Sequence, residues 1–514
     1  MHEHTPHASS NKFLLGFIAV VIVGYVGAGI AGLPQGHRGS APGHALEASE
    51  SQHHSAITEH PPYWMVTPFA ALLLAIAVFP LVPRVSEWWE SNLHKFYVSV
   101  FLGVATLLYY LLVYGHPVVA HWPVERTVEP SAGGLSFGLT WAVLQNAVLS
   151  EYIPFITLLL TLYTISGGLR IEGDLPAHPF TNSLFLAAGA VLANLIGTTG
   201  AAMVLIRPLL ETNRERKHIR HTVVFFIFVV CNCGGCLLPL GDPPLFLGYL
   251  RGVPFLWTTR LWLEWLSVNG ALVAVYYVWD RWWCYPREEP RDITIDEARV
   301  HRLRFAGLWP NGLLLLGVIP TIMLLDPAKT FPGTDWHPWI YLREVIQLGL
   351  IALSLLLGSH ATRRQNRFTY HAILEVAALF LGIFVCMQAP LQILHVRGPA
   401  LGLTLPSQFF WATGSLSSVL DNAPTYVVFL ETARSLGGDP ANLVARAQES
   451  LLVAISLGAV FMGAMTYIGN GPNFMVKAIA EKSGVPMPSF FGYLLYSVGV
   501  LVPLFVVLTL VFFR

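Results

Sequence analysis

Long apolar stretches dominate this chain, and they constrain its fold more than any other feature. A helix that crosses a membrane needs about 20 mostly apolar residues. About eleven stretches reach that length, namely 13–32, 64–82, 96–115, 151–171, 221–240, 258–280, 306–325, 341–359, 372–394, 450–468 and 490–513. Only 12% of the 514 residues are charged, whereas soluble domains carry roughly 25%. The sequence therefore predicts an all-α, polytopic membrane protein whose main partner is the lipid bilayer.

The charged residues balance, with 30 basic and 30 acidic side chains. A chain without net charge has no overall field that would attract nucleic acid, so no nucleic-acid partner is expected. No phosphate-binding loop, nucleophile elbow or zinc-binding helix motif occurs in a suitable setting. An integral membrane enzyme is therefore only the third interpretation of the sequence, and no cofactor is expected.

Residues 1–61 form an N-terminal region with many histidines and one long apolar stretch, 13–32. This stretch follows Lys12 and precedes a polar segment, which fits either a cleaved signal peptide or a retained anchor. We interpret the histidines as solvating residues, with weak metal binding or pH sensing as alternatives. These residues are His2, His4, His7, His37, His44, His53, His54 and His60.

Two further apolar stretches, 182–210 and 406–433, are too long for one straight span and are interrupted in the middle. The interruptions are Gly197-Thr198-Thr199-Gly200 in the first and Asp421-Asn422-Ala423-Pro424-Thr425 in the second. Non-helical backbone at membrane depth is tolerated only where protein or a wet cavity satisfies its polar groups. Each stretch is therefore predicted to be a re-entrant helical hairpin with its tip near a functional site.

The basic residues test this topology, because cytoplasmic loops carry an excess of lysine and arginine. We place residues 1–12 in the cytoplasm and assume that each hairpin enters and leaves the membrane by the same face. The basic residues then fall on the cytoplasmic side, whereas the external segments 116–149 and 327–340 hold few. The basic residues on the cytoplasmic side are Arg84, Lys95, Arg214, Arg216, Lys217, Arg220, six arginines between 281 and 304, Arg363, Arg364 and Arg367. This distribution favours hairpins over complete spans.

Residues 151–255 and 375–490 contain the same parts in the same order. Each begins with a span that opens at a glutamate, continues with a hairpin, and ends in a broken span followed by Gly-Val-Pro. The breaks are Gly241-Asp242-Pro243-Pro244 and Gly469-Asn470-Gly471-Pro472. Five crossings separate the two opening spans, so the halves are predicted to be inverted in the membrane, as in secondary transporters.

This repeat divides the chain into five predicted regions. They are the N-terminal region 1–61, scaffold spans 62–150, a first repeat 151–280 with hairpin 182–210, a cytoplasmic link with connecting spans 281–371, and a second repeat 372–514 with hairpin 406–433. Glu151 and Glu375 open the first span of each repeat, where the helix dipole stabilises an acid. A proton relay is the alternative role for both.

Asp421 is the leading candidate for an ion site, because a carboxylate inside lipid is costly unless it is protonated, paired or bound to a cation. Its alternative role is that of a helix N-cap. Asp242 is either a second ligand or a turn former before two prolines. Oxygen atoms of nearby polar residues suit a hard cation such as sodium, with Asp421 as its metal ligand. These further candidates are Asn422, Thr425, Asn470, Asn473, Thr198, Thr199 and Asn194.

Other polar residues in apolar surroundings have simpler explanations. Arg207 and Lys477 lie near helix ends and can reach the cytoplasmic face, although either could instead meet an anionic substrate. Cys231, Cys233 and Cys236 lie inside an apolar run and are expected to be buried packing residues. A soft-metal site is the alternative for the three thiols, but no fourth ligand is evident nearby.

Three motifs resemble those of a known group of transporters. They are Leu-Pro-Leu-Gly-Asp-Pro-Pro-Leu-Phe-Leu-Gly at 238–248, Ser-Ser-Val-Leu-Asp-Asn-Ala-Pro-Thr-Tyr at 417–426 and Tyr-Ile-Gly-Asn-Gly-Pro-Asn-Phe-Met-Val-Lys-Ala at 467–478. Over residues 62–514 the chain resembles the ion transporter superfamily, in its branch of citrate transporters and sodium/proton antiporters. This branch is related to NhaD-type antiporters and arsenite-efflux permeases.

The resemblance implies a homodimer with paired re-entrant hairpins and an elevator-like movement of the hairpin domains. The dicarboxylate branch carries Ser-Asn-Thr at both hairpin tips, whereas this chain has Gly-Thr-Thr and Asp-Asn-Ala. We therefore expect a secondary transporter that exchanges sodium ions for protons, in a bacterial inner membrane. The alternative is a cation-coupled transporter of citrate or another carboxylate.

Overall fold

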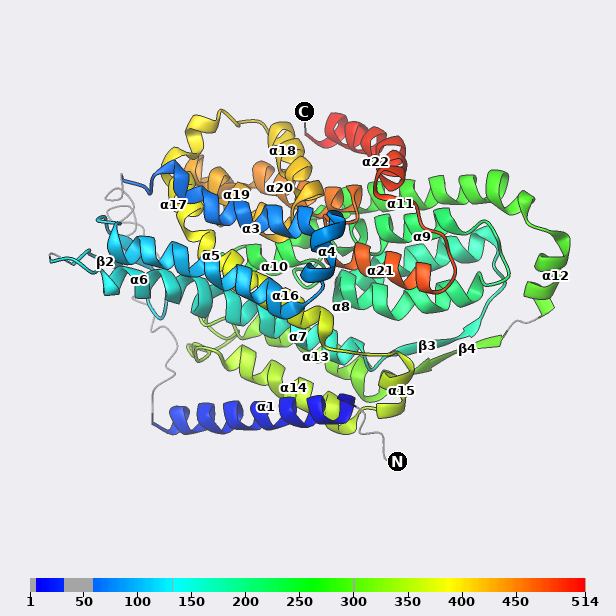
Figure 1. Cartoon of the computed structure of the whole chain (residues 1–514), viewed down its shortest axis with the longest axis horizontal. Helices are drawn as coiled ribbons and strands as arrows, with labels where there is room; N and C mark the ends of the chain where they lie inside the picture. Colours follow the sequence, from blue (N-terminus) through cyan, green and yellow to red (C-terminus); the bar gives the residue numbers. More distant parts are fainter. Residues whose placement is uncertain (1–5, 32–58, 132, 299–300, 514) are drawn as a thin grey trace. The chain divides into compact units, whose positions relative to one another are not determined.

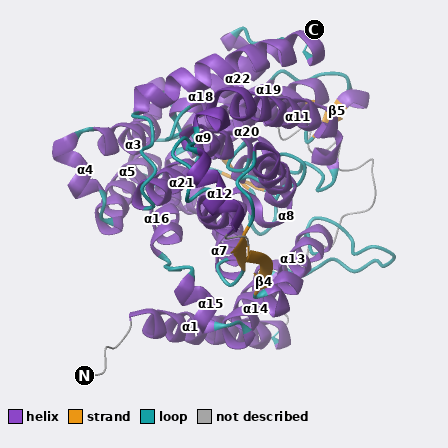
Figure 2. Ribbon diagram, turned by 90° about the vertical axis from the view of Figure 1, so that its right-hand side faces the viewer, coloured by secondary structure: helices purple, strands orange, loops and turns teal. Residues whose placement is uncertain are grey.

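The computed structural model describes residues 6–31, 59–131, 133–298 and 301–513. Helices make up most of this chain, and the described strands form three two-stranded antiparallel ribbons (Figures 1 and 2). The predicted all-α class is therefore confirmed. Most of the N-terminal histidines lie outside the described residues, namely His2, His4, His37, His44, His53 and His54, and the side chain of His7 is also outside them.

Within the described residues, seven helices are long and apolar enough to cross a membrane. They are Asn11–Ile30, Tyr63–Leu81, Asn92–Leu112, Phe137–Ser166, Pro179–Thr212, Trp257–Arg287 and Phe490–Phe512. An eighth span results if the bent pair His371–Cys386 and Gln388–Leu401 is counted as one. The chain is therefore a multi-pass membrane protein.

The predicted eleven complete spans are not confirmed, since one of these seven helices, Pro179–Thr212, contains a predicted hairpin and is not among the eleven. Three of the predicted spans are shorter apolar helices, Arg220–Gly235, Leu308–Leu324 and Glu449–Met465. A fourth, 341–359, is the 16-residue helix Leu342–Leu357. The first and third shorten because the chain leaves the helix at the Cys/Gly-rich segment after Val229 and at Gly463. A hydropathy pattern does not detect such breaks, since the residues in them are themselves apolar or small.

The predicted boundary between the external segment 116–149 and the span 151–171 is wrong. The helix starts at Phe137, inside the segment assigned to an external loop, and runs to Ser166 through a π-helical segment, Gln145–Tyr152. Glu151 therefore lies in the middle of a helix and is buried, so it does not open a span at the helix N-terminus. A single charged residue such as Glu151 therefore does not mark the end of this helix.

The chain forms two compact units, and each combines two separate parts of the sequence. The first unit contains Met1–Ile165 and Leu313–Arg397. Its helices and strands are α1 Pro6–Ile30, α3 Thr67–Val78, α4 Pro83–Trp89, α5 Asn92–Leu112, β1 Val118–Ala120, β2 Arg126–Val128, α6 Phe137–Leu144, α7 Ile153–Ser166, α13 Leu313–Leu324, α14 Leu342–Leu357, α15 His360–Gln365, α16 His371–Cys386 and α17 Gln388–Arg397.

Close packing of α5 against α16 organises the first unit. Gly382 has no Cβ, and a Cβ there would meet the side chain of Ser99 at 2.3 Å. The backbone N–H of Gly382 donates to Ser99 Oγ at 2.9 Å. Glu375 is the fifth residue of α16 and lies beyond its first turn, so the prediction that it opens the helix is wrong, and its partner is Lys95 at 2.6 Å. Small residues thus let the two helices approach, as in other membrane bundles.

The second unit contains Ser166–Gly312 and Gly398–Arg514. All nine candidate ion-site residues belong to it. Its helices and strands are β3 Arg170–Asp174, α8 Pro179–Thr212, α9 Arg220–Val229, α10 Pro243–Leu250, α11 Trp262–Trp279, α12 Pro290–Ala298, β4 His301–Ala306, α18 Pro406–Val419, α19 Asn422–Ser435, β5 Leu443–Val444, β6 Ala447–Gln448, α20 Glu449–Met462, α21 Gly471–Lys482 and α22 Phe490–Phe512.

The long helix α8 is a hairpin. Its backbone leaves the helical conformation at Gly197, with φ 77° and ψ 155°, a region that glycine adopts readily. Asn182 and Asn213, at its two ends, donate to each other through their side-chain amides at 2.8 Å. In a straight helix these residues would be roughly 45 Å apart, at 1.5 Å per residue. The predicted stretch 182–210 thus reverses direction at its tip, while its re-entry from one membrane face stays a prediction.

The helices α18 and α19 form a second hairpin. They meet at Asp421, whose backbone is extended with φ −61° and ψ 135°. The rings of Phe409 and Phe429 lie edge to face with centroids 6.3 Å apart, so the chain reverses between them. In Figure 1, α18 and α19 lie close to α20, and a close approach of Gly458 to the carbonyl oxygen of Phe410 brings α18 against α20.

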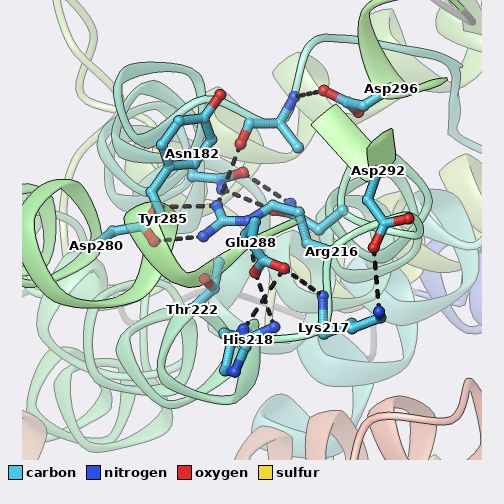
Figure 3. A network of polar contacts seen from close by, with 12 residues as sticks. Asn182, Arg216, Lys217, His218, Thr222, Asp280, Tyr285, Glu288, Asp292 and Asp296 are labelled. Atoms are coloured by element: carbon cyan, nitrogen blue, oxygen red, sulfur yellow. Dashed lines mark hydrogen bonds and ion pairs between the residues drawn. The ribbon is translucent and has the colours of Figure 1, made fainter. Parts of the chain in front are cut away.

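A buried cluster of charges joins the link after α8 to the segment after α11 (Figure 3). Arg216 donates to the two carboxylate oxygens of Asp280 at 2.5 and 3.0 Å and to Glu288 at 3.4 Å. The backbone N–H groups of Lys217 and His218 also donate to Glu288, at 2.9 and 2.8 Å. Burial alone would lower the pKa of Arg216, but its contacts with Asp280 outweigh burial and raise the pKa above the ordinary value.

The same cluster places two predicted cytoplasmic segments side by side. Lys217 pairs with Glu289 at 2.5 Å and with Asp292 at 3.4 Å. Residues 211–220 and 281–292 therefore lie at the same end of the second unit. This agrees with the expectation that both belong to one face of the membrane, and the assignment of that face to the cytoplasm stays a prediction.

We expect cysteines introduced at these two segments to react alike. In a Cys284→Ser background, Arg214→Cys and Arg291→Cys should both resist an impermeant thiol reagent added to intact cells, because both face the cytoplasm. Both should react after the membrane is permeabilised. Reaction of both in intact cells would contradict the predicted orientation, and reaction of only one would contradict the contact between the segments.

Arg216→Met should strongly destabilise the protein, because it leaves Asp280 and Glu288 buried without their cation. Breaking such a buried pair costs about 3–5 kcal/mol. The matched control is Arg214→Met, since Arg214 pairs with Glu211 at an exposed site and such pairs contribute about 1 kcal/mol or less. Thermal unfolding of the purified protein measures both, and equal midpoints would show that the buried cluster adds no stability.

Candidate ion-binding site

Four helix starts meet at one buried point of the second unit. Three of them follow an extended residue: Asp242 before α10, Asp421 before α19 and Asn470 before α21. The fourth is the second arm of α8, which begins at Thr198 after the kink. Helix N-termini carry unpaired N–H groups and a partial positive charge, so such a point favours a negative group.

Asp242 occupies this point. Its side chain is 1% exposed. Oδ1 accepts hydrogen bonds from Thr198 Oγ1 at 2.9 Å and from Asn470 Nδ2 at 3.0 Å. Oδ2 accepts one from Asn422 Nδ2 at 2.6 Å. Four predicted site residues, which come from four different helix starts, therefore form one cluster.

The charge of Asp242 has no basic partner in the described part of the chain. Its three contacts are a hydroxyl and two neutral amides. A carboxylate offers about four lone-pair positions, so one remains on Oδ2. Because an unpaired buried charge is strongly unfavourable, this site is suited to take up a proton or a cation.

Asp421 caps α19, because its Oδ1 accepts the backbone N–H of Ala423 at 3.0 Å. A cap is compatible with ion binding, so an ion at Asp421 stays a prediction. Thr425 donates its hydroxyl to the backbone oxygen of Asp421 at 2.9 Å, within the same turn. The neighbouring residue Asn422, and not Asp421, donates to the central carboxylate.

The remaining candidates hold the helix breaks in shape. Asn194 accepts the backbone N–H of Leu237 at 2.7 Å and donates to Ala190 at 2.9 Å. Asn473 donates to the carbonyl oxygens of Gly463 and Thr466 at 2.8 and 2.9 Å. Thr199 is half-buried beside Thr198.

One residue of the cluster escaped the sequence analysis. Asn232 is fully buried, and its Nδ2 donates to Asn473 Oδ1 at 2.8 Å. Next to it, the carbonyl oxygen of Cys231 accepts from Asn470 at 3.1 Å. The available signal in the sequence is a lone amide inside an apolar run, between two cysteines. Cys231, Cys233 and Cys236 are all buried with free thiols, as expected of packing residues.

Two breaks of the second unit have the same local structure. In each, a glycine packs on the backbone of another glycine six residues earlier. A Cβ on Gly241 would lie 2.2 Å from the carbonyl oxygen of Gly235, and one on Gly469 would lie 2.7 Å from that of Gly463. The spacing Gly-x5-Gly-Asp/Asn therefore describes both breaks.

The helices that follow the two breaks also end alike. Gly252 has φ 93° and Gly484 has φ 89°. The N–H of Val253 donates to Gly248, and that of Val485 donates to Ala480, both at 3.0 Å. These are the bonds of a Schellman cap, which needs a residue with positive φ. The Gly-Val-Pro motifs noted in the sequence thus mark equivalent helix ends.

The fold and this site define a class of protein: a multi-pass membrane transport protein whose buried polar cluster lies at helix breaks. A comparison with family models agrees. The chain belongs to the family described as "Putative citrate transport", whose model matches residues 58–513. A comparison with curated proteins finds no match. Family membership supports a membrane transporter.

Gly241→Ala should destabilise the site, because its methyl group would meet the backbone oxygen of Gly235, which cannot move aside easily. We expect a loss of about 1–3 kcal/mol, typical of overpacking. Gly471→Ala is the matched control, since a Cβ at Gly471 has nothing within 4 Å. Thermal unfolding of both purified variants tests this, and equal stabilities would argue against the tight glycine contact.

Proposed function

We propose that this chain is a secondary active transporter that moves citrate or a similar carboxylate together with a cation bound at Asp242. The observation that supports it is the buried carboxylate with three neutral donors and no basic partner among the described residues. The family match supports citrate as the cargo. Citrate transport, the alternative in the sequence analysis, therefore now has more support than sodium/proton exchange.

The proposed coupling follows from charge. When Asp242 is ionised and alone, it repels a negatively charged substrate. When a sodium ion or a proton neutralises it, the converging helix N-termini can attract the carboxylates of the substrate. Cation binding then increases the affinity for the anion, and by linkage the anion increases the affinity for the cation.

Sodium/proton exchange remains a second candidate, because one acid that holds either ion in turn suffices for it. Lys477, which could have met an anionic substrate, pairs with Glu481 at 3.4 Å and lies over the ring of Tyr467. This pairing leaves the cluster at Asp242 with neutral and acidic side chains, as a cation exchanger requires.

We further propose that the second unit is the moving part of an elevator-like mechanism. Both hairpins and both glycine-packed breaks lie in that unit. The matching breaks and helix caps support the inverted repeat, whose two halves would bind from opposite sides of the membrane. The homodimer and the bacterial inner membrane stay predictions of the resemblance.

Asp242→Asn should abolish coupling, because the amide cannot bind a proton and lacks the charge that attracts a cation. In proteoliposomes we expect citrate uptake driven by a sodium or proton gradient to fall by about tenfold or more. Asp421→Asn is the matched control. Asparagine caps helices as well as aspartate does, so this variant should keep most of the uptake.

Two outcomes would contradict the proposal. Near wild-type uptake by Asp242→Asn would show that another group couples transport. A sodium-dependent pH change inside the vesicles, without any uptake of labelled citrate, would support sodium/proton exchange instead.

A further inference from the structure

The side-chain oxygen of Asn232 is buried without a hydrogen-bond partner. Its Nδ2 donates twice, to the carbonyl oxygen of Ile227 and to Asn473 Oδ1, both at 2.8 Å. Its Oδ1 accepts no hydrogen bond in the described part of the chain, although the residue is 0% exposed. The two donor contacts fix the orientation of the amide. A buried, unsatisfied oxygen held in this way needs a physical explanation.

This oxygen packs against Gly463, which has no side chain. A Cβ built on Gly463 would lie 2.9 Å from Asn232 Oδ1 and 3.3 Å from the carbonyl oxygen of Gly469. It would also lie 3.6 Å from Asn422 Nδ2, the atom that donates to Asp242. Asn232 Oδ1 therefore lies close to Gly463, next to the amide that donates to the central carboxylate.

The position is specific to one of the two breaks. Asn232 stands three residues before Gly235, and Val460 stands three residues before the equivalent Gly463. If Asn232 only supported the shape of a break, both breaks would be expected to need such an amide. A polar residue in one break and an apolar residue in the other indicates a role that is not repeated.

We propose that Asn232 Oδ1 is a ligand of the coupling cation, and this inference rests on the proposed function. Asp242 supplies the negative charge, Asn232 supplies a neutral oxygen, and Asn422 holds the carboxylate in place. Amide, carbonyl and carboxylate oxygens are ligands of hard cations. The site therefore suits an ion of the class of sodium, and binding would satisfy the unpaired oxygen.

Sodium binding can be measured without transport. The full-length protein is purified in lipid nanodiscs, and its thermal midpoint is followed as sodium chloride replaces choline chloride at constant ionic strength. A ligand that binds only the folded protein raises the midpoint. We expect the wild-type midpoint to rise with sodium, and Asn232→Ala to need about tenfold more sodium, or more, for the same rise.

A second variant leaves Asn232 itself in place. Gly463→Ala adds a methyl group 2.9 Å from Asn232 Oδ1, which forces that oxygen to shift, and should weaken the sodium response to a similar degree. Gly471→Ala, in the same segment but with open space around the added methyl, should respond as the wild type does. If Asn232→Ala fails to fold, Gly463→Ala decides the question.

The outcomes separate this inference from the proposed function. A wild-type sodium response in both Asn232→Ala and Gly463→Ala would overturn the role of Asn232, and so would a wild-type protein that does not respond to sodium. If Asp242→Asn in the same series loses coupled transport, the proposed function survives that result. If Asp242→Asn keeps coupled transport, the proposed function fails, whatever the sodium response of the Asn232 variants.

Discussion

The second unit depends on holding one carboxylate, that of Asp242, away from water and without a basic partner among the described residues. An intact helix has no free donors to offer such a group, because its N–H groups bond to its own carbonyls. The helix breaks supply the donors. They expose helix N-termini and bring Thr198, Asn422 and Asn470 to the carboxylate from separate segments. The site and the irregular backbone are therefore one structural feature.

Glycine makes these breaks possible. At Gly241 and Gly469 the backbone of a break folds onto its own earlier glycine, at distances that exclude a Cβ. At Gly197 a positive φ reverses the first hairpin. At Gly463 a Cβ would meet Asn232 Oδ1 at 2.9 Å. The folded breaks and the close approach of Asn232 thus depend on the same residue type, since each requires that no Cβ be present.

Several parts of the fold could be predicted because their signals are local. Long apolar stretches identify spans, and a Gly-Thr-Thr-Gly or Asp-Asn-Ala-Pro interruption identifies a hairpin tip. The failures have physical causes. The helix from Phe137 extends through Glu151, which is buried inside it, and a single acid is a poor marker of a helix end. The helix ends at Val229 and before Gly463 were not predicted, because the residues that follow them are mostly apolar or small.

The sequence alone determined the class of protein, the two hairpins and the list of polar residues near their tips, because these follow from hydropathy and from glycine and proline spacing. Only the tertiary structure decided how those residues divide their roles. Asp421 caps its own helix, whereas Asp242 collects donors from segments up to 228 residues away. The proposed role of Asn232 is evident only from its contacts, because its Nδ2 donates to Asn473 and its Oδ1 is buried without a partner among the described residues. Side chains that meet through three-dimensional packing leave no spacing pattern along the chain, and this is why the centre of the site could not be located from the sequence.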